Sequence, residues 1–391
     1  MLHINEKLSR IRENDRNGKV KIMIIGLGSV GCYLLDYLMS AGDQNLEIIV
    51  AGRNREKMES DVNIVRVASL IRRQNRSNVI IADGVDLEKP ETVAECLKTY
   101  QPDIIVNASR VYAGLKYGSI SWKNVRAYGI WIPLSIKYIR NIMQAYSMAD
   151  CNAVVINTSY SDGTIPWLKS AGSAYPDFGS GNLNHLLPRI KFAAAREMNI
   201  PDFWNINVIL ATAHFHDVVI SKEGQNEGIE QLLRIEYKGE VLPLDQDDIL
   251  RKSQIAMPVD AKRNMMNASS NYDIIMCILR ALRSGGSEVF YAPGAFGEIG
   301  GYPVKIDGSA CTACIDTSTF PMELMREKNR ASLALDGIES IENGIMTYTD
   351  ALIAKAQKAF GVTLPKQVAF SQINDTAEMI IREIIQPALG K

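Results

Sequence analysis

The sequence has little of what several specialised classes of protein require. Its 43 Lys and Arg residues are balanced by 44 Asp and Glu residues, so it lacks the basic excess that binds nucleic acid or anionic membranes. No apolar run approaches the roughly 20 residues that span a membrane. The charged first 19 residues lack the apolar core of a signal peptide. Six cysteines in 391 residues are few, so we expect reduced thiols and a cytoplasmic location.

The first 160 residues alternate short apolar segments with segments of helical spacing. Strands are expected at residues 21–25, 46–52, 78–87, 102–109 and 152–159. Strands that are apolar throughout and alternate with helices are typical of a parallel sheet covered on both faces. We therefore predict the α/β class, with a doubly wound parallel-sheet (Rossmann) nucleotide-binding domain over residues 1–160.

The pattern changes after this domain. Strand-like segments at 205–220, 232–241 and 302–308 lie among helices and glycine-rich loops, which favours an α+β substrate and dimerisation domain with a mainly antiparallel sheet. This second domain is expected over residues 161–320. Residues 321–391 are predicted to form a largely helical C-terminal segment that can return to the first domain. We expect a homodimer.

Three glycines follow the first predicted strand in G-x-G-x-x-G spacing, namely Gly26, Gly28 and Gly31. The first permits a tight turn, the second lets the backbone approach a pyrophosphate, and the third lets helix and strand pack closely. The following helix begins with Ser29 and Val30 and offers free N–H groups to phosphates. This loop is predicted to bind a dinucleotide. The alternative is a structural turn in a fold that has lost its ligand.

The second predicted strand ends in Arg53, Asn54 and Arg55 rather than in the carboxylate that usually holds the ribose hydroxyls of NAD. A guanidinium binds a 2′-phosphate through charge-assisted hydrogen bonds, so NADP is favoured over NAD. The alternative is that both arginines are only solvated. Because ligands bind beyond the carboxyl ends of parallel strands, further cofactor contacts are expected from the other strand ends. These are Asp86, Leu87, Asn107, Ala108, Ser109 and Ser159.

The glycine motif, the segment DLEKPETVAECLKTYQPDIIVNAS and the strand end NTSYSDG resemble the nucleotide-binding domain of saccharopine-dehydrogenase-type reductases over roughly the first 160 residues. The resemblance implies a pyridine nucleotide and chemistry at a C–N or C–O bond of an amino-acid-like compound. It supplies no catalytic residue. Short-chain dehydrogenases are a second candidate family, because Tyr112 and Lys116 have their Tyr-x-x-x-Lys spacing. That pair follows the fourth strand rather than the fifth, and the glycine spacing also differs.

Three of the four histidines lie after the predicted nucleotide-binding domain. His185 lies at a glycine-opened helix start together with Asn182, Arg189 and Lys191, a setting that suits a substrate carboxylate. The alternative is a capped surface helix. Tyr112 is a further candidate for substrate binding.

His214 and His216 stand two apart on a predicted strand and should therefore point to the same face. Imidazole titrates near neutral pH, so either could act as a general acid or bind the substrate. A zinc site with Cys311 and Cys314 is the minor alternative. Our main expectation is that no metal is bound.

These patterns predict an NADP-dependent oxidoreductase that transfers a hydride between NADPH and a C=N or C=O bond of a small amino-acid-, imino-acid- or keto-acid-like substrate. The proton donor is expected to be His185, His214 or His216, with Tyr160 as the alternative. The other hypotheses are a short-chain-dehydrogenase-like carbonyl reductase, a non-catalytic NADP-binding sensor and a zinc-stabilised binding module.

Overall fold

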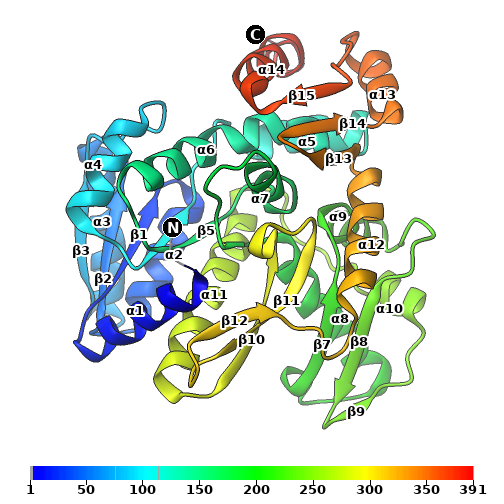
Figure 1. Cartoon of the computed structure of the whole chain (residues 1–391). Coiled ribbons are helices and arrows are strands. Elements are labelled where there is room, and N and C mark those ends of the chain that lie inside the picture. Colours follow the sequence, from blue (N-terminus) through cyan, green and yellow to red (C-terminus); the bar gives the residue numbers. More distant parts are fainter. Residues whose placement is uncertain (1–2, 75, 113, 391) are drawn as a thin grey trace.

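The computed structural model describes residues 3–74, 76–112 and 114–390, with the backbone alone described at residues 114–117 and 119. Six parallel strands form its central sheet, namely β1 (Val20–Ile25), β2 (Leu46–Ala51), β3 (Asn78–Ala82), β4 (Ile104–Asn107), β5 (Val154–Asn157) and β6 (Phe178–Gly179). Their order is β3-β2-β1-β4-β5-β6 (Figure 1). The chain reverses its direction of winding between β1 and β4, and such a reversal opens a ligand crevice at the carboxyl ends of these strands.

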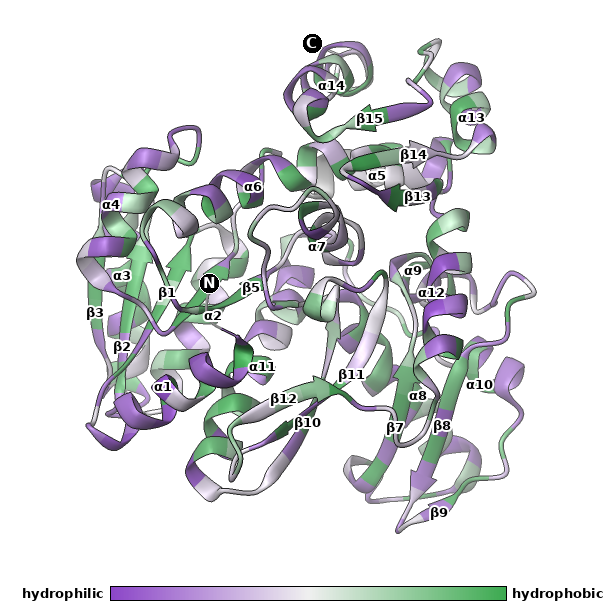
Figure 2. Cartoon of the chain, in the orientation of Figure 1, coloured by the Kyte–Doolittle hydropathy of each residue, from purple (hydrophilic) through white to green (hydrophobic). Residues whose placement is uncertain are grey.

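Helices cover both faces of this sheet. Helices α2 (Ser29–Ser40), α3 (Arg55–Ile71) and α11 (Asn264–Ser284) pack on one face, and α4 (Pro90–Tyr100) and α6 (Ile132–Met148) on the other. Successive strand residues point to opposite faces, so each of the strands β1 to β5 contributes to two separate hydrophobic cores. Figure 2 shows β1, β2 and β3 hydrophobic along most of their length. The predicted doubly wound Rossmann fold is confirmed.

The N-terminal helix α1 (Ile4–Arg16) is joined to the far end of this sheet by a buried ion pair. Lys7 Nζ lies 2.8 Å from Asp177 Oδ2, and both residues are buried. The same carboxylate accepts the backbone N–H of Val155. The parallel sheet thus continues into β6, past residue 160.

The region after the sheet is an antiparallel α+β unit, as predicted. One sheet consists of β7 (Ile206–Ala211), β8 (Leu232–Tyr237) and β9 (Glu240–Val241). Another consists of β10 (Ser287–Pro293), β11 (Gly301–Asp307) and β12 (Thr312–Ile315). The helices of this unit are α8 (Asn182–Met198), α9 (His214–Glu223) and α10 (Gln246–Lys252), whereas α7 (Ser161–Ser170) connects β5 to β6 of the parallel sheet.

The prediction of a continuous strand through residues 205–220 is wrong. The strand β7 ends at Ala211, and helix α9 begins at His214. Asp162 Oδ2 accepts the backbone N–H of His214 at 2.6 Å, which places a carboxylate at the positive end of the helix. The apolar residues that suggested a strand instead form the buried face of the helix, because tertiary packing overrides β-propensity.

The C-terminal segment returns to the first domain, as the sequence analysis allowed. It contains α12 (Met322–Leu335), α13 (Asp350–Phe360), α14 (Ile373–Ile380) and α15 (Gln386–Ala388). It also contains an antiparallel sheet that was not predicted, made of β13 (Ile338–Glu342), β14 (Ile345–Tyr348) and β15 (Gln367–Ala369). Helix α14 packs on α6, and their apolar residues share one core (Figure 1). Among the described residues, no helix is long and apolar enough to cross a membrane.

Candidate active site

The turn between β1 and α2 has the geometry that dinucleotide binding needs. Gly26 has a φ of +92°, and a Cβ atom at Gly31 would lie 2.3 Å from the Gly26 carbonyl oxygen. A Cβ atom at Gly28 would meet nothing within 4 Å, so the space in front of this residue is open. No side chain of the described residues caps the N-terminus of α2. Its free N–H groups are therefore available to a phosphate.

A cavity of about 390 Å³ lies at this turn, between the ends of β1, β2, β3 and β4. The predicted cofactor residues that line it are Gly26, Gly28, Arg53, Asn54, Asp86, Leu87, Ala108 and Ser109. The predicted cofactor residues outside its described lining are Ser29, Val30, Gly31, Arg55, Asn107 and Ser159. Asn107 is buried, and its side chain donates to Asn157 Oδ1 and accepts from Ser109.

The two arginines after β2 differ in position. Arg53 lines the cavity and forms no ion pair with another described residue, whereas Arg55 pairs with Asp83 at 3.1 Å. Lys57, which the sequence analysis did not single out, lines the cavity as a second cation. Asn54 accepts the backbone N–H of Lys57 and so caps helix α3.

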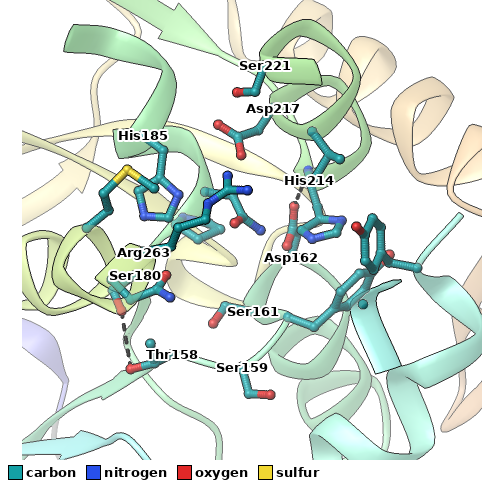
Figure 3. A pocket seen from close by; sticks show the side chains of 18 of the residues that line it. Thr158, Ser159, Ser161, Asp162, Ser180, His185, His214, Asp217, Ser221 and Arg263 are labelled. Atoms are coloured by element: carbon teal, nitrogen blue, oxygen red, sulfur yellow. Dashed lines mark hydrogen bonds between the residues drawn. The ribbon is translucent and has the colours of Figure 1, made fainter. Parts of the chain in front are cut away.

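A second cavity of about 510 Å³ lies beyond the ends of β4 and β5, between the parallel sheet and helices α8 and α9 (Figure 3). Arg110 lines both cavities, so the two adjoin. Six residues predicted as site residues line the second cavity, namely Ser159, Tyr160, Asn182, His185, Arg189 and His214. The topology thus brings together residues from the end of β5 and from two helices of the second unit.

Three of the residues predicted for catalysis or substrate binding are not part of the described lining of this cavity. His216 is buried, with Nδ1 2.7 Å from Ser332 Oγ and Nε2 3.0 Å from the Asn226 carbonyl. The expected pairing of His214 and His216 on one face fails because they lie on a helix, where residues two apart diverge. Burial lowers the pKa of Lys191, and the one charge that opposes this shift is that of Asp273, which is outside the described lining of the cavity. Tyr112 packs against the core that contains α4, and the Lys116 side chain lies outside the described residues.

His214 is held by a carboxylate from a distant part of the chain. Its Nδ1 lies 2.8 Å from Asp336 Oδ2, and its ring packs at 4.9 Å and 4.7 Å from the rings of Tyr128 and Tyr160. Burial alone would lower the pKa of His214, but the adjacent Asp336 carboxylate raises it.

Tyr160 also depends on Asp336. It adopts a left-handed conformation with a φ of +46°, and its hydroxyl donates to Asp336 Oδ2 at 2.5 Å. Burial and the nearby carboxylates of Asp336 and Asp162 raise the pKa of Tyr160 well above its ordinary value. Its proton is therefore committed to Asp336 and is a poor source for a substrate.

His185 is a neutral group. Burial, with the Arg189 and Arg263 guanidinium groups, lowers its pKa to about 3. An imidazole with that pKa carries no proton to give at neutral pH. Among the three predicted histidines, His214 is therefore the one suited to acid–base work in this cavity.

Sequence reasoning missed two carboxylates and several cations of the cavity. Asp162 and Asp217 are 2% and 4% exposed, and burial raises the pKa of both, that of Asp217 to about 7. Asp217 follows His214 by three residues, so it would have been found had the helix been predicted. The cations of the lining that it missed are Arg110, Lys222 and Arg263.

The zinc alternative has no support in the part of the chain that is described. That part contains no group of three or more His, Cys, Asp or Glu side chains placed to hold a metal ion. Cys311 is buried, and Cys314 is exposed on β12.

The sheet and the glycine turn define a nucleotide-binding domain of the NAD(P) class. Within that class, residues 22–118 match the saccharopine dehydrogenase NADP binding domain, so the resemblance is confirmed over this range. No curated protein matches the chain.

The fold of almost the whole chain is similar to that of solved malate and lactate dehydrogenases. The malate dehydrogenase of Plasmodium falciparum in complex with NADH is 15% identical, with 88% of this chain and 99% of that chain covered and a TM-score of 0.51. The malate dehydrogenase of Picrophilus torridus is 15% identical, with 81% and 96% covered and a TM-score of 0.53. The lactate dehydrogenase of Eimeria maxima with NADH and oxamate is 13% identical, with 81% and 91% covered and a TM-score of 0.52. Identities this low establish the fold alone.

Proposed function

We propose that this protein is an NADP-dependent oxidoreductase acting on a C=N or C=O bond of a small amino-acid-, imino-acid- or keto-acid-like substrate. The observation that carries the proposal is the position of His214. It lines a cavity that adjoins the dinucleotide cleft through Arg110, and its Nδ1 lies 2.8 Å from Asp336 Oδ2. A bound nicotinamide would supply or accept the hydride.

The preference for NADP rests on the end of β2. Arg53 faces the dinucleotide cleft and is free of ion pairs within the described residues, whereas Lys57, the other cation of the lining, pairs with Asp61 at 2.7 Å. The chain there carries Arg53, Asn54 and Arg55 and no carboxylate, so a 2′-phosphate meets attraction rather than repulsion.

His214 is proposed as the proton donor and acceptor. The hydrogen bond from Nδ1 to Asp336 fixes the ring and favours its protonated form, which leaves Nε2 to exchange a proton with the substrate oxygen or nitrogen. Asp336 is a positioning residue, because it touches His214 and Tyr160 and is not part of the cavity lining among the described residues.

The charge of the cavity favours an anionic substrate group. Arg189 is 3% exposed, and its Nε has no hydrogen-bond partner among the described residues. Arg263 lines the same cavity (Figure 3). Guanidinium groups bind carboxylates through paired N–H donors, so these two residues are proposed to hold a substrate carboxylate.

The proposal is tested by a matched pair of histidine variants. NADPH oxidation is screened against 2-oxo acids with and without ammonium, and NADP⁺ reduction against 2-amino and 2-hydroxy acids. His214→Gln should lower turnover by roughly a hundredfold or more with nucleotide binding retained, because general acid–base catalysis contributes about that much. His216→Gln removes a histidine outside the described lining and should keep turnover.

Two other outcomes favour the rival functions. Tight NADPH binding without any turnover in the screen would support a nucleotide sensor. Turnover that survives in His214→Gln and is lost on replacing Tyr112 would support the short-chain-dehydrogenase-like alternative, although Tyr112 lies outside the described lining of the cavity.

A further inference from the structure

The second cavity concentrates buried polar atoms that lack partners. Within the described residues, five of its lining side chains have a buried atom without a hydrogen bond, namely Asp162 Oδ1, His185 Nε2, Arg189 Nε, Asp217 Oδ1 and Ser221 Oγ. Buried polar groups in folded proteins are nearly always satisfied. A cluster of exceptions in one cavity therefore indicates the polar atoms of a ligand.

The two carboxylates of this group, Asp162 and Asp217, indicate the charge of the ligand. Asp217 lies one turn after His214 on α9, and Asp162 lies at the N-terminus of the same helix (Figure 3). In its ionised form a carboxyl group only accepts hydrogen bonds, so each of the two free oxygens then requires a donor. A substrate with oxygen alone at its reacting carbon would bring no positive charge to them. Two buried carboxylates would repel its anionic groups.

We infer that the substrate carries a cationic nitrogen held by Asp162 and Asp217, with its anionic group at Arg189 and Arg263, so that the reacting bond is C–N rather than C–O. This inference rests on the proposed function and narrows it. The cavity holds both signs of charge, which matches a zwitterionic amino compound better than a 2-hydroxy or 2-oxo acid.

Asp217 also supplies a chemical step. An amine must be neutral before its carbon can form a C=N bond, because the nitrogen lone pair makes that bond. The ionised Asp217 takes the proton: an N–H bond of the ammonium breaks, its electron pair stays on nitrogen, and an O–H bond forms on the carboxyl group. In the opposite direction the Asp217 carboxylic acid returns this proton to the new amine.

The charged groups around Asp217 suit this exchange. Burial and the Asp162 carboxylate raise the pKa of Asp217, while His214, Arg189 and Arg263 lower it, and together these groups bring it to about 7. An acid whose pKa lies near neutrality both accepts and returns a proton at working pH. No described hydrogen bond commits Asp217 Oδ1 to a residue of the chain.

The experiment compares ligands that share a carbon skeleton. Binding to the full protein is measured by calorimetry with 2-amino acids, N-methyl-2-amino acids, 2-hydroxy acids and 2-oxo acids of two to six carbons. Reduced nucleotide is added with the amines and oxidised nucleotide with the oxo acids, so no turnover occurs. The best amine should bind at least about tenfold more tightly than its hydroxy and oxo counterparts, as expected for a charge-assisted hydrogen bond.

Asp217→Asn should remove most of this preference, with a roughly tenfold or greater loss for the amine and little change for the hydroxy acid. Asp273→Asn is the matched control, since Asp273 is outside the described lining of the cavity. The inference is overturned if no amine is preferred, or if Asp217→Asn keeps the preference. Turnover of hydroxy acids with normal NADPH binding would overturn it and leave the proposed function standing. A wild-type protein that binds no NADP(H) would overturn the proposed function itself.

Discussion

Asp217 should make the free protein less stable as the pH rises, and Asp217→Asn should abolish this effect. The side chain is 4% exposed, and burial raises its pKa from the ordinary value of 3.8 to about 7. The folded protein therefore binds this proton more tightly than the unfolded chain does. The stability that this group contributes is complete below pH 4 and is lost as the pH rises through 7.

The magnitude follows from the pKa difference. A shift of about three units at 1.36 kcal/mol per unit corresponds to roughly 4 kcal/mol between pH 4 and pH 8. Asparagine has nearly the same shape and does not ionise. The variant should therefore match the wild type near pH 4 and exceed its free energy of unfolding by up to about 4 kcal/mol at pH 8.

Urea unfolding followed by circular dichroism at pH 4, 5, 6, 7 and 8 measures this difference. Asp375→Asn, at an exposed position of α14, serves as the control for removing one negative charge. If the wild type and Asp217→Asn change in parallel across this pH range, the carboxyl group is not desolvated as described, and the reasoning about the unpartnered oxygen fails.

Three other substitutions test separate parts of the structure. Arg53→Asp should weaken NADPH binding roughly ten- to a hundredfold. Arg55→Asp makes the same charge change but should weaken binding less than about threefold, because Arg55 already pairs with Asp83. Equal effects of the two variants in a fluorescence titration would contradict the assignment of Arg53 to the 2′-phosphate. Gly31→Ala should abolish NADPH binding in the same titration, since its Cβ would lie 2.3 Å from the Gly26 carbonyl oxygen; unchanged affinity would show that the turn is not the phosphate site. Asp177→Asn should lower the free energy of unfolding by about 3–5 kcal/mol because it leaves the Lys7 ammonium buried without its partner; a loss under about 1 kcal/mol in urea unfolding would refute this.

The first domain was predictable because its signals are local. Short apolar strands, the glycine spacing and the arginines after the second strand all lie within a few residues of one another. The sheet and the lining of the dinucleotide cleft followed from them, including Arg53, Asp86 and Ser109.

The second cavity was only partly predictable because the residues in contact there are distant in sequence. His214 and Asp336 are 122 residues apart, and Tyr160 reaches the same carboxylate across 176 residues. No local pattern marks Asp336, which lies just after helix α12. The run of apolar residues after His214 looked like a strand, and this obscured the position of Asp217 one helical turn away.

The proposed function requires that the cleft at Gly26–Gly31 binds NADP(H) in preference to NAD(H). Calorimetric titration of the wild-type protein with NADPH and with NADH at one ionic strength measures this preference. NADPH should bind at least about tenfold more tightly, because Arg53 can form a charge-assisted contact with the 2′-phosphate. Equal affinity for the two nucleotides would contradict the cofactor assignment, and no binding of either would contradict the proposed oxidoreductase.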